Sequence, residues 1–322
     1  MPRLDLLDRK LMYELDLDAR ASASQLARKL KRSKETVAFR INRLIDAGYI
    51  NYFYTVCNTS KLGYTYYKVY VKFKNITPEK EGELIDYVRN QDHLAFLGSV
   101  EGLYDLIFLI MVKTPNDMGK VMDVFMQKYG AFVQAKDICA FLETHRLNNR
   151  FLYAGEKRED TFHSGVIGSY VLDSVDQKIL DVLSSHARMP ITEIAKKVGI
   201  DHKAVAYRMR KLEKENIILR YVSSPNFDKL GLQFYQINIS LKDPSVKQAL
   251  ISYFDATHAC LFAIEMLGKY DILFEVHVEN TEKLKLIIDG FRKQFTQKYN
   301  DYDILTVNKE YLMVWNPFAE DN

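Results

Sequence analysis

The sequence predicts an α+β protein built from two repeats, each a winged-helix-like helix-turn-helix domain followed by a ferredoxin-like βαββαβ domain. The first observation behind this prediction is a duplication: residues from Leu4 onward align with those from Leu172 without a gap over sixty residues. The second is that basic residues are concentrated at the same place in each repeat. The third is that the apolar residues change from a helical period to an alternating one at the same position in each repeat. An offset of 168 residues indicates a duplicated domain, because solenoid repeats run to roughly 20–50 residues.

The two repeats divide the chain into five segments. Each repeat places its helix-turn-helix domain first, and a mixed-charge, glycine-containing stretch between the repeats is typical of a solvated linker. We expect the helix-turn-helix domains at 1–57 and 172–225, the βαββαβ domains at 58–153 and 226–322, and the linker at 154–171.

The composition limits the class of protein. At 322 residues and 48% hydrophobic, the chain can bury two or more ordinary cores. Its three cysteines are odd in number and far apart, which favours reduced thiols. The sequence shows no signal peptide and no apolar run that could span a bilayer. We therefore expect a cytoplasmic protein that does not associate with a membrane.

Three short helices are expected at the start of each repeat. Asp5 and Asp173 are good N-caps for the first helix, whose apolar residues recur every four positions along one face. The second helix is short and begins near Ser22 in the first repeat. Three such helices with a tight turn before the third are typical of a helix-turn-helix domain, whose third helix enters the DNA major groove.

The ends of the third helix are marked by residues suited to a left-handed backbone. The turn before this helix contains Lys31 in the first repeat and Gly199 in the second, and a left-handed lysine costs roughly 1 kcal/mol. The helix is expected to stop at Gly48 or Asn216, the residue types that most readily take a left-handed C-terminal position.

Positive charge is confined to one place in each repeat. Residues 20–43 carry a local charge of +7 and residues 188–211 one of +5, whereas the whole chain carries only +3. The rest of the chain therefore carries −9. This distribution favours two nucleic-acid footprints on an acidic body, and double-stranded DNA is the expected partner.

The outward face of each third helix supplies the candidate DNA contacts. Arginine can pair with guanine through two hydrogen bonds, while lysine more often binds phosphate. A solvated helix face is the alternative interpretation, and Arg40 and Arg208 could instead brace their helix through an internal ion pair. The candidate DNA-binding residues are Lys34, Thr36, Phe39, Arg40, Arg43, His202, Lys203, Tyr207, Arg208, Arg210 and Lys211.

The remainder of each repeat follows the order strand, helix, strand, strand, helix, strand. Alternating side chains in the strands indicate that helices cover one face of each sheet. The expected elements are 66–73, 78–90, 94–100, 105–112, 116–129 and 133–143, and then 234–241, 246–254, 260–266, 271–278, 282–299 and 304–314.

These motifs together resemble the leucine-responsive regulator/AsnC (Lrp/AsnC) family of transcription regulators. The resemblance rests on Leu-Asp-x-x-Asp at 4–8 and 172–176, Ala-Arg at 19–20 and 187–188, and Gly-x-Tyr-Asp at 102–105 and 268–271. It covers nearly the whole chain twice, whereas family members usually carry one unit per chain and dimerise. The resemblance therefore implies a fused pseudo-dimer, with homo-oligomers through the βαββαβ domains as a further expectation.

The family also binds small effectors, often amino acids, near the Gly-x-Tyr-Asp turn at a contact between subunits. A small metabolite such as an amino acid is therefore an expected partner. An equally weighted alternative is structural, because glycine supplies a positive φ in a hairpin and aspartate caps a turn. The candidate effector-binding residues are Gly102, Tyr104, Asp105, Gly268, Tyr270 and Asp271.

The sequence offers no basis for nucleotide or metal chemistry. It has no P-loop, no Gly-x-Gly-x-x-Gly, no His-Glu-x-x-His and no Cys-x-x-Cys, so we expect no cofactor and no metal. His93 and His258 begin nearly equivalent strands, and we interpret them as sheet or effector-contact residues.

Two other functions compete with a DNA-binding regulator. Haem-precursor (siroheme-type) decarboxylases look like this family and also occur as two fused units. The central hairpins here, 96–101 and 262–267, are acidic and aliphatic and would hold an anionic tetrapyrrole poorly. We therefore expect that the chain is not an enzyme. A metabolite-sensing scaffold without DNA binding is the remaining alternative, and the basic third helices speak against it.

Overall fold

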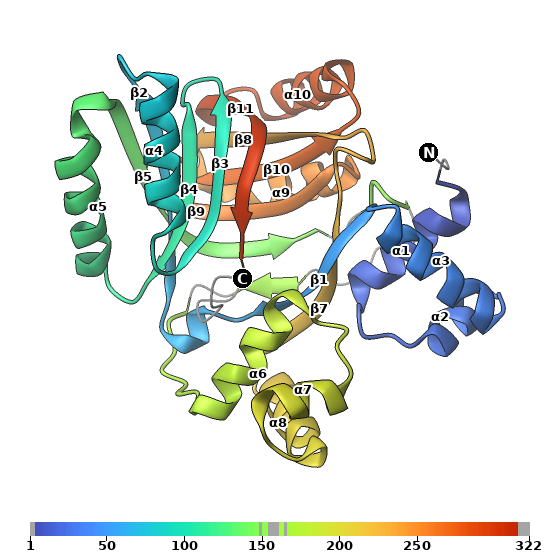
Figure 1. The fold of residues 1–322 in the computed structure, drawn as a ribbon. Coiled ribbons are helices and arrows are strands. Elements are labelled where there is room, and N and C mark those ends of the chain that lie inside the picture. The colour runs from blue at the N-terminus through green and yellow to red at the C-terminus, as the bar shows by residue number, and fades with distance from the viewer. Residues whose placement is uncertain (1–3, 148–149, 154–160, 164–165, 315–322) are drawn as a thin grey trace.

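The computed structural model describes residues 4–147, 150–153, 161–163 and 166–314, so half of the predicted linker (154–171) lies outside the described residues. Figure 1 shows two small helical domains beside a larger body of strands with helices on its outside. The α+β prediction is confirmed: each repeat is a helix-turn-helix domain followed by a βαββαβ domain. Among the described residues, no helix is both long and apolar enough to cross a membrane.

The helix-turn-helix domains form as local sequence signals dictate. Asp5 and Asp8 form a reciprocal capping box at the first helix, and Asp173 caps the corresponding helix of the second repeat. Gly48 and Asn216 take the expected left-handed conformation, with φ of 66° and 52°. The six helices are α1 (Leu6–Leu17), α2 (Ala23–Leu30), α3 (Lys34–Asp46), α6 (Ser174–Ser185), α7 (Ile191–Val198) and α8 (His202–Lys214).

Two hinge strands connect the helical domains to the rest of the molecule and pair with each other. β1 (Ile50–Cys57) and β7 (Ile218–Pro225) run antiparallel as a two-stranded sheet. The first helix of each repeat packs against the hinge strand of the other, α1 against β7 and α6 against β1. Each helix-turn-helix domain is therefore positioned by the opposite repeat.

Eight of the described strands form a closed hydrogen-bonded ring. Each repeat contributes four antiparallel strands, and β11–β3 and β5–β9 pairings join the two repeats. A short strand, β6 (Thr161–His163), adds to the end of β5. The ring strands are β2 (Thr65–Phe73), β3 (Leu94–Glu101), β4 (Leu106–Val112), β5 (Val133–Arg146), β8 (Gln233–Leu241), β9 (Cys260–Leu267), β10 (Ile272–Val278) and β11 (Tyr299–Met313).

Helices cover the outer face of each half of the ring (Figure 1). Along β2, Val69 and Val71 pack into a core with the first pair of helices, while Tyr70 between them faces the second repeat. The covering helices are α4 (Pro78–Arg89), α5 (Pro115–Tyr129), α9 (Lys247–Ala256) and α10 (Thr281–Phe295). Short 3₁₀ turns complete the fold: η1 (Ser60–Leu62), η2 (Gly130–Phe132) and η3 (Pro244–Val246).

The expected elements differ from the structure mainly at the last strand of each repeat. β5 continues to Arg146 instead of stopping at residue 143, because Ala140–Arg146 pairs with β9 of the other repeat. β11 begins at Tyr299, where a helix was expected, because Tyr299 pairs with Leu241. Pairing with a distant strand decided both boundaries.

We predict that Lys31→Gly stabilises the protein by about 1 kcal/mol, because Lys31 holds a left-handed backbone (φ 52°) that glycine adopts without strain. Gly199→Lys is the reciprocal change at the same position of the second repeat. A Cβ there has nothing within 4 Å, so its cost should come from the backbone alone. Urea unfolding should show shifts of opposite sign, and shifts of the same sign would contradict this explanation.

Candidate nucleic-acid interface and ligand cavity

A reciprocal arginine contact joins the two helix-turn-helix domains. Arg20 donates to the carbonyl oxygens of Ala187 (2.6 Å) and Met189 (3.1 Å) in the other repeat. Arg188 donates in return to the carbonyl oxygens of Ala19 and Ala21. We call this pair of contacts the arginine clasp. Each repeat makes the same contact to the other, so the arginine clasp fixes the two helical domains about a pseudo-two-fold axis.

The main chain repeats the same exchange. Ala19 N–H donates to Tyr221 O of β7 (2.9 Å), and Ala187 N–H donates to Phe53 O of β1 (2.8 Å). A third contact has no counterpart: the buried Asp16 of α1 pairs with the buried Arg146 of β5, at 2.5 Å between Oδ1 and Nη2. The first helix-turn-helix domain therefore has an additional anchor on the ring of strands.

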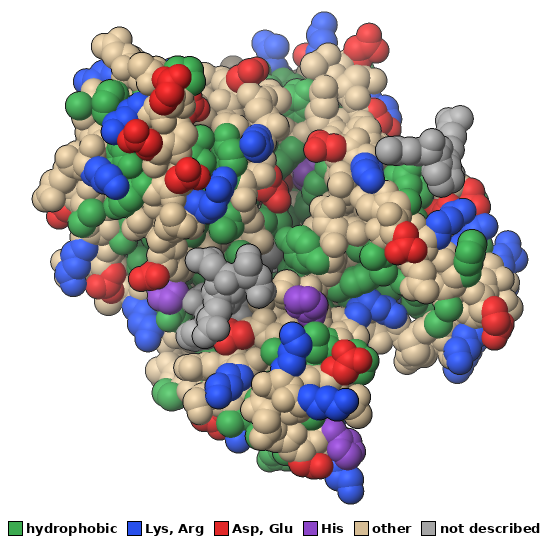
Figure 2. Space-filling model, in the orientation of Figure 1, with side chains coloured by type: hydrophobic (Ala, Val, Ile, Leu, Met, Phe, Trp, Pro, Cys, Tyr) green, Lys and Arg blue, Asp and Glu red, His purple; other side chains and the backbone are tan. Residues whose placement is uncertain are grey.

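The third helices, α3 and α8, expose most of the residues predicted to contact DNA. Phe39 and Tyr207 occupy equivalent positions and are 67% and 66% exposed, far more than a core aromatic would be. Lys and Arg side chains lie on the visible surface of both helical domains (Figure 2). The predicted residues with exposed side chains are Lys34, Phe39, His202, Lys203, Tyr207, Arg210 and Lys211.

Arg40 and Arg43 are instead engaged within the first domain. Arg40 Nη1 lies 2.6 Å from Asp5 Oδ2 and 2.8 Å from Asp8 Oδ1, and Arg43 Nη2 lies 2.5 Å from Asp8 Oδ1. The hydrogen bond from Arg40 lowers the pKa of Asp5 to about 2. These arginines tie the third helix to the N-terminus of the first.

Arg208 has the same role in the second domain. Its Nη1 lies 2.6 Å from Asp173 Oδ2 and 2.7 Å from Asp176 Oδ1. Asp176 is buried, and the residue matching Arg43 here is Lys211, which forms no ion pair with a described residue. The internal ion pair considered for Arg40 and Arg208 is thus present in both repeats.

The Gly-x-Tyr-Asp turns meet at the contact between the repeats. The hydroxyls of Tyr104 and Tyr270 lie 3.3 Å apart, and both rings are buried. A Cβ on Gly102 would lie 2.8 Å from Ile304 O, and one on Gly268 would lie 2.7 Å from Ile138 O. Both glycines therefore allow a turn to approach the last strand of the other repeat.

The polar atoms of these turns are bonded within the protein. Tyr104 donates to Asp137 (2.5 Å) and accepts from Lys269 (2.6 Å). Asp105 accepts from Phe73 N–H and Asp271 from Leu241 N–H, each at 2.7 Å. The structure thus brings the six predicted effector residues together at a contact between repeats, and effector binding there stays a prediction.

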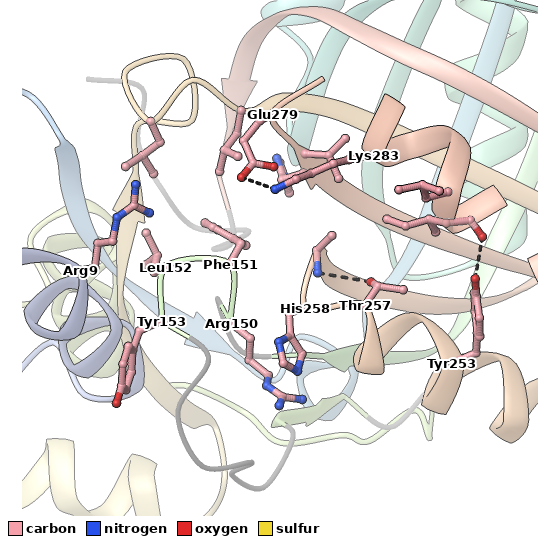
Figure 3. Close-up of a pocket in the computed structure, with 17 residues that line it drawn as sticks. Arg9, Arg150, Phe151, Leu152, Tyr153, Tyr253, Thr257, His258, Glu279 and Lys283 are labelled. Atoms are coloured by element: carbon pink, nitrogen blue, oxygen red, sulfur yellow. Dashed lines mark hydrogen bonds and ion pairs between the residues drawn. The ribbon is translucent and has the colours of Figure 1, made fainter. Parts of the chain in front are cut away.

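A cavity of about 650 Å³ lies between the first helix-turn-helix domain and the second βαββαβ domain (Figure 3). Arg9 of α1, Arg150 and Tyr153 of the segment after β5, and Lys283 of α10 line it. His258 also lines it, and the guanidinium of Arg150 lies beside its ring. Burial, assisted by Arg150, lowers the pKa of His258. We call this space the interdomain cavity.

His277 of β10 is a buried polar side chain in the wall of this cavity. It is 2% exposed, and its ring stacks on Phe227 and Phe234 at centroid distances of 3.9 and 4.6 Å. Neither ring nitrogen has a hydrogen-bond partner among the described residues. Burial lowers the pKa of His277 to about 3, so the imidazole is neutral near pH 7, with one N–H donor and one acceptor nitrogen.

A group of cation-ligand side chains lies elsewhere, between β5 and β9. The ligand atoms of Glu143, His145 and Glu265 lie within 4.8 Å of one another. Lys247 Nζ lies 3.1 Å from Glu265 Oε2 and supplies positive charge to this group. Because a lysine already neutralises one of the two carboxylates, the three residues do not by themselves indicate a metal site.

Family models and curated relatives match the two helix-turn-helix domains described above. The AsnC-type helix-turn-helix model matches residues 172–213, and the winged helix-turn-helix DNA-binding model matches residues 4–51. An uncharacterised HTH-type transcriptional regulator of Pyrococcus horikoshii is 30% identical over 127 residues, which cover 38% of this chain and 85% of the relative. The chain belongs to the Lrp/AsnC family. The regulator LysM of Sulfurisphaera tokodaii is also 30% identical, over 123 residues, which cover 38% of this chain and 85% of LysM.

Two solved structures that match nearly the whole chain are those of an enzyme. The siroheme decarboxylase NirDL superposes with a TM-score of 0.66 at 13% identity, covering 96% of this chain and 93% of that one. Its complex with an iron-uroporphyrin III analogue gives the same score, covering 98% and 95%. At this identity the match shows a shared fold. The prediction that this chain is not an enzyme is contradicted by these matches.

That prediction failed because it considered only the central hairpins. The basic and imidazole groups that could hold an anion come from α1, from the segment after β5, from the turn before β9, from β10 and from α10. These segments are far apart in sequence, and no motif links them. Only His258 carried a signal, as a histidine interpreted as a sheet or effector-contact residue.

We predict that Arg208→Ala lowers the free energy of unfolding by about 2 kcal/mol, because Asp176 would be buried without its arginine. Arg40→Ala should cost less, because Arg43 still pairs with Asp8. Urea unfolding measures both. Arg210→Ala is the control: its side chain is exposed and bonds only its own helix in the described structure, so stability should change by less than about 0.5 kcal/mol. An Arg40→Ala cost equal to that of Arg208→Ala would contradict the explanation.

Proposed function

We propose that this chain is a sequence-specific DNA-binding transcriptional regulator that acts as a fused pseudo-dimer. The observation that carries the proposal is the arginine clasp, which holds two helix-turn-helix domains about a pseudo-two-fold axis with both third helices exposed. Helix-turn-helix domains related by a two-fold axis bind half-sites one helical turn, or a multiple of it, apart. Because their exposed residues differ, the preferred site should be an imperfect palindrome.

The exposed residues divide by role. Arg40 and Arg208 are engaged by aspartates, so base reading falls to residues such as Phe39, Tyr207 and Arg210. An exposed aromatic ring can contact a thymine methyl group, and Arg210 can pair with guanine. The exposed lysines are suited to phosphate, which makes binding sensitive to salt. A small metabolite such as an amino acid would tune this binding, with the Gly-x-Tyr-Asp turns as one candidate place.

A second candidate function is decarboxylation of a carboxylate-bearing tetrapyrrole. Two observations favour it: the whole-chain fold match to siroheme decarboxylase NirDL, and the interdomain cavity with its arginines, lysine and histidines. The cavity's residues fit an anionic macrocycle, because Arg9, Arg150 and Lys283 could pair with carboxylates around it. This function does not compete for the third helices, so each can be tested separately.

We predict that DNA selected from a random pool shows two protected half-sites about one helical turn, or a multiple of it, apart. Phe39→Ala should weaken binding about 10-fold and lose protection of one half-site, and Tyr207→Ala should do the same at the other. Val124→Ala, which removes a 52% exposed side chain from α5, is the control and should bind as the wild type does. DNase footprinting and fluorescence anisotropy are the measurements.

Three results would count against the regulator. A single short footprint would exclude the pseudo-dimer, and affinity that ignored ionic strength would exclude the phosphate contacts. Failure to select any DNA would favour a scaffold without DNA binding.

For the second candidate, we predict that anaerobic incubation with siroheme yields a product whose mass has fallen by that of CO₂. Arg150→Gln should reduce the rate at least about 10-fold, since a charge-assisted contact to a carboxylate would be lost. Arg89→Gln on α4, an arginine that does not line the cavity, is the matched control. Unchanged siroheme with correctly folded wild-type protein would remove this candidate.

A further inference from the structure

We propose that the interdomain cavity is an effector site for an organic acid with an apolar or aromatic body. In this proposal, which rests on the regulator function proposed above, the ligand bridges Arg9 of the first helix-turn-helix domain to Arg150 and His277 at the second βαββαβ domain. Its binding would thereby set the position of one DNA-binding domain relative to the other.

Two buried polar groups at the cavity call for a ligand. Both nitrogens of His277 and Nε of Arg150 are buried without a hydrogen-bond partner among the described residues. Buried polar groups are nearly always hydrogen-bonded, because leaving one unsatisfied forfeits its interaction with water. Both residues line the same cavity, so one molecule could satisfy both.

The charges of the lining select the ligand's chemistry. Arg9, Arg150 and Lys283 line the cavity with one acid, Glu279, whose carboxylate lies 2.6 Å from Lys283 Nζ. Arg150 Nη1 also lies 3.6 Å from Oδ1 of Asp255, which does not line the cavity, so three cations meet two acids. The excess of positive charge favours an anion, and arginine favours a carboxylate with two parallel hydrogen bonds. Apolar residues complete the wall, so the rest of the ligand should be apolar: Leu230, Leu232, Leu286 and Ile287.

The walls of the cavity belong to different domains of the fold. α1 packs on the segment Arg150–Tyr153, where the Tyr153 ring lies 6.0 Å from Tyr13 and Lys10 Nζ lies 4.9 Å above it. In the same segment, Phe151 contacts the rings of Phe227 (5.7 Å) and His277 (5.9 Å). A ligand that contacts both sides binds best when they are docked, and it therefore shifts the population toward that arrangement.

The repeats have diverged at the residues that make this site. Arg9 of the first repeat corresponds to Gln177 of the second, and His277 of the second repeat corresponds to Met111 of the first. The matching place between the second helix-turn-helix domain and the first βαββαβ domain therefore lacks both the arginine and the histidine. Leu232 corresponds to Tyr64, whose ring lies 5.5 Å from His93 and beneath Lys113. A ligand at the interdomain cavity would consequently act on the first helix-turn-helix domain more than on the second.

The experiment uses the full chain and 8-anilinonaphthalene-1-sulfonate, an anionic aromatic dye whose fluorescence rises in an apolar site. We expect saturable binding that is at least about 10-fold weaker in Arg150→Gln and in Arg9→Gln, with Arg89→Gln unchanged. His277→Met, which installs the residue of the first repeat, should also weaken binding, and circular dichroism confirms that each variant is folded. Dye affinity that is the same in wild type, Arg150→Gln and His277→Met would overturn the site.

A matched pair of competitors tests the ligand class. 3-Phenylpropionate should displace the dye, whereas 3-phenylpropionamide, which lacks the charge, should not. Equal displacement by both would overturn the assignment to an organic acid. Binding by Arg9→Gln that equals the wild type would overturn the bridge to the first helix-turn-helix domain, even if the cavity binds the dye.

Linkage to DNA separates this inference from the proposed function. If 3-phenylpropionate changes DNA affinity by some factor, DNA must change 3-phenylpropionate affinity by the same factor. We expect a factor of at least about 5, the lower end of ordinary coupling, and its loss in Arg9→Gln. If the wild-type protein binds no DNA, the proposed regulator function is contradicted. The dye measurements still test whether the interdomain cavity binds an organic acid. DNA binding that 3-phenylpropionate leaves unchanged overturns the coupling alone.

Discussion

The arrangement of this molecule depends on the exchange of contacts between its two repeats. The hinge strands β1 and β7 pair with each other, and Arg20 and Arg188 each donate to carbonyl oxygens of the opposite repeat. A buried or partly buried arginine whose carbonyl partners were removed would be left without compensation for its lost hydration. The relative position of the two third helices is therefore set by a few hydrogen bonds, each of which needs both repeats in place.

The same exchange recurs in the ring of strands. β5 pairs with β9 and β11 with β3, so neither four-stranded sheet has its edges free. Unpaired edges bind other chains readily, and closure removes them. The Gly-x-Tyr-Asp turns lie at this contact, where Gly102 and Gly268 let each turn approach the last strand of the other repeat. A motif that marks the family therefore also joins the repeats.

Fusion of two units allowed them to become different. In a dimer of identical chains, every change occurs on both sides of the axis. Here the position of His277 is occupied by Met111 in the other repeat, and the position of Arg9 by Gln177. The ion pair between Asp16 and Arg146 likewise anchors only one of the two helical domains. The fold is shared with a decarboxylase, and in this chain the two exposed third helices and the cationic cavity lie at separate places.

The sequence by itself determined the duplication, the helix caps, the left-handed positions at Gly48 and Asn216, and the βαββαβ order. These features are local, because caps and periodicity act over a few residues, and a duplication can be read by alignment. The tertiary structure alone decided that Arg40 and Arg208 bind aspartates about thirty-five residues away, that β5 runs on to Arg146, and that Arg9, Arg150 and His277 line one cavity. Each of these depends on which distant segments pack together, and no local pattern of residue types specifies that.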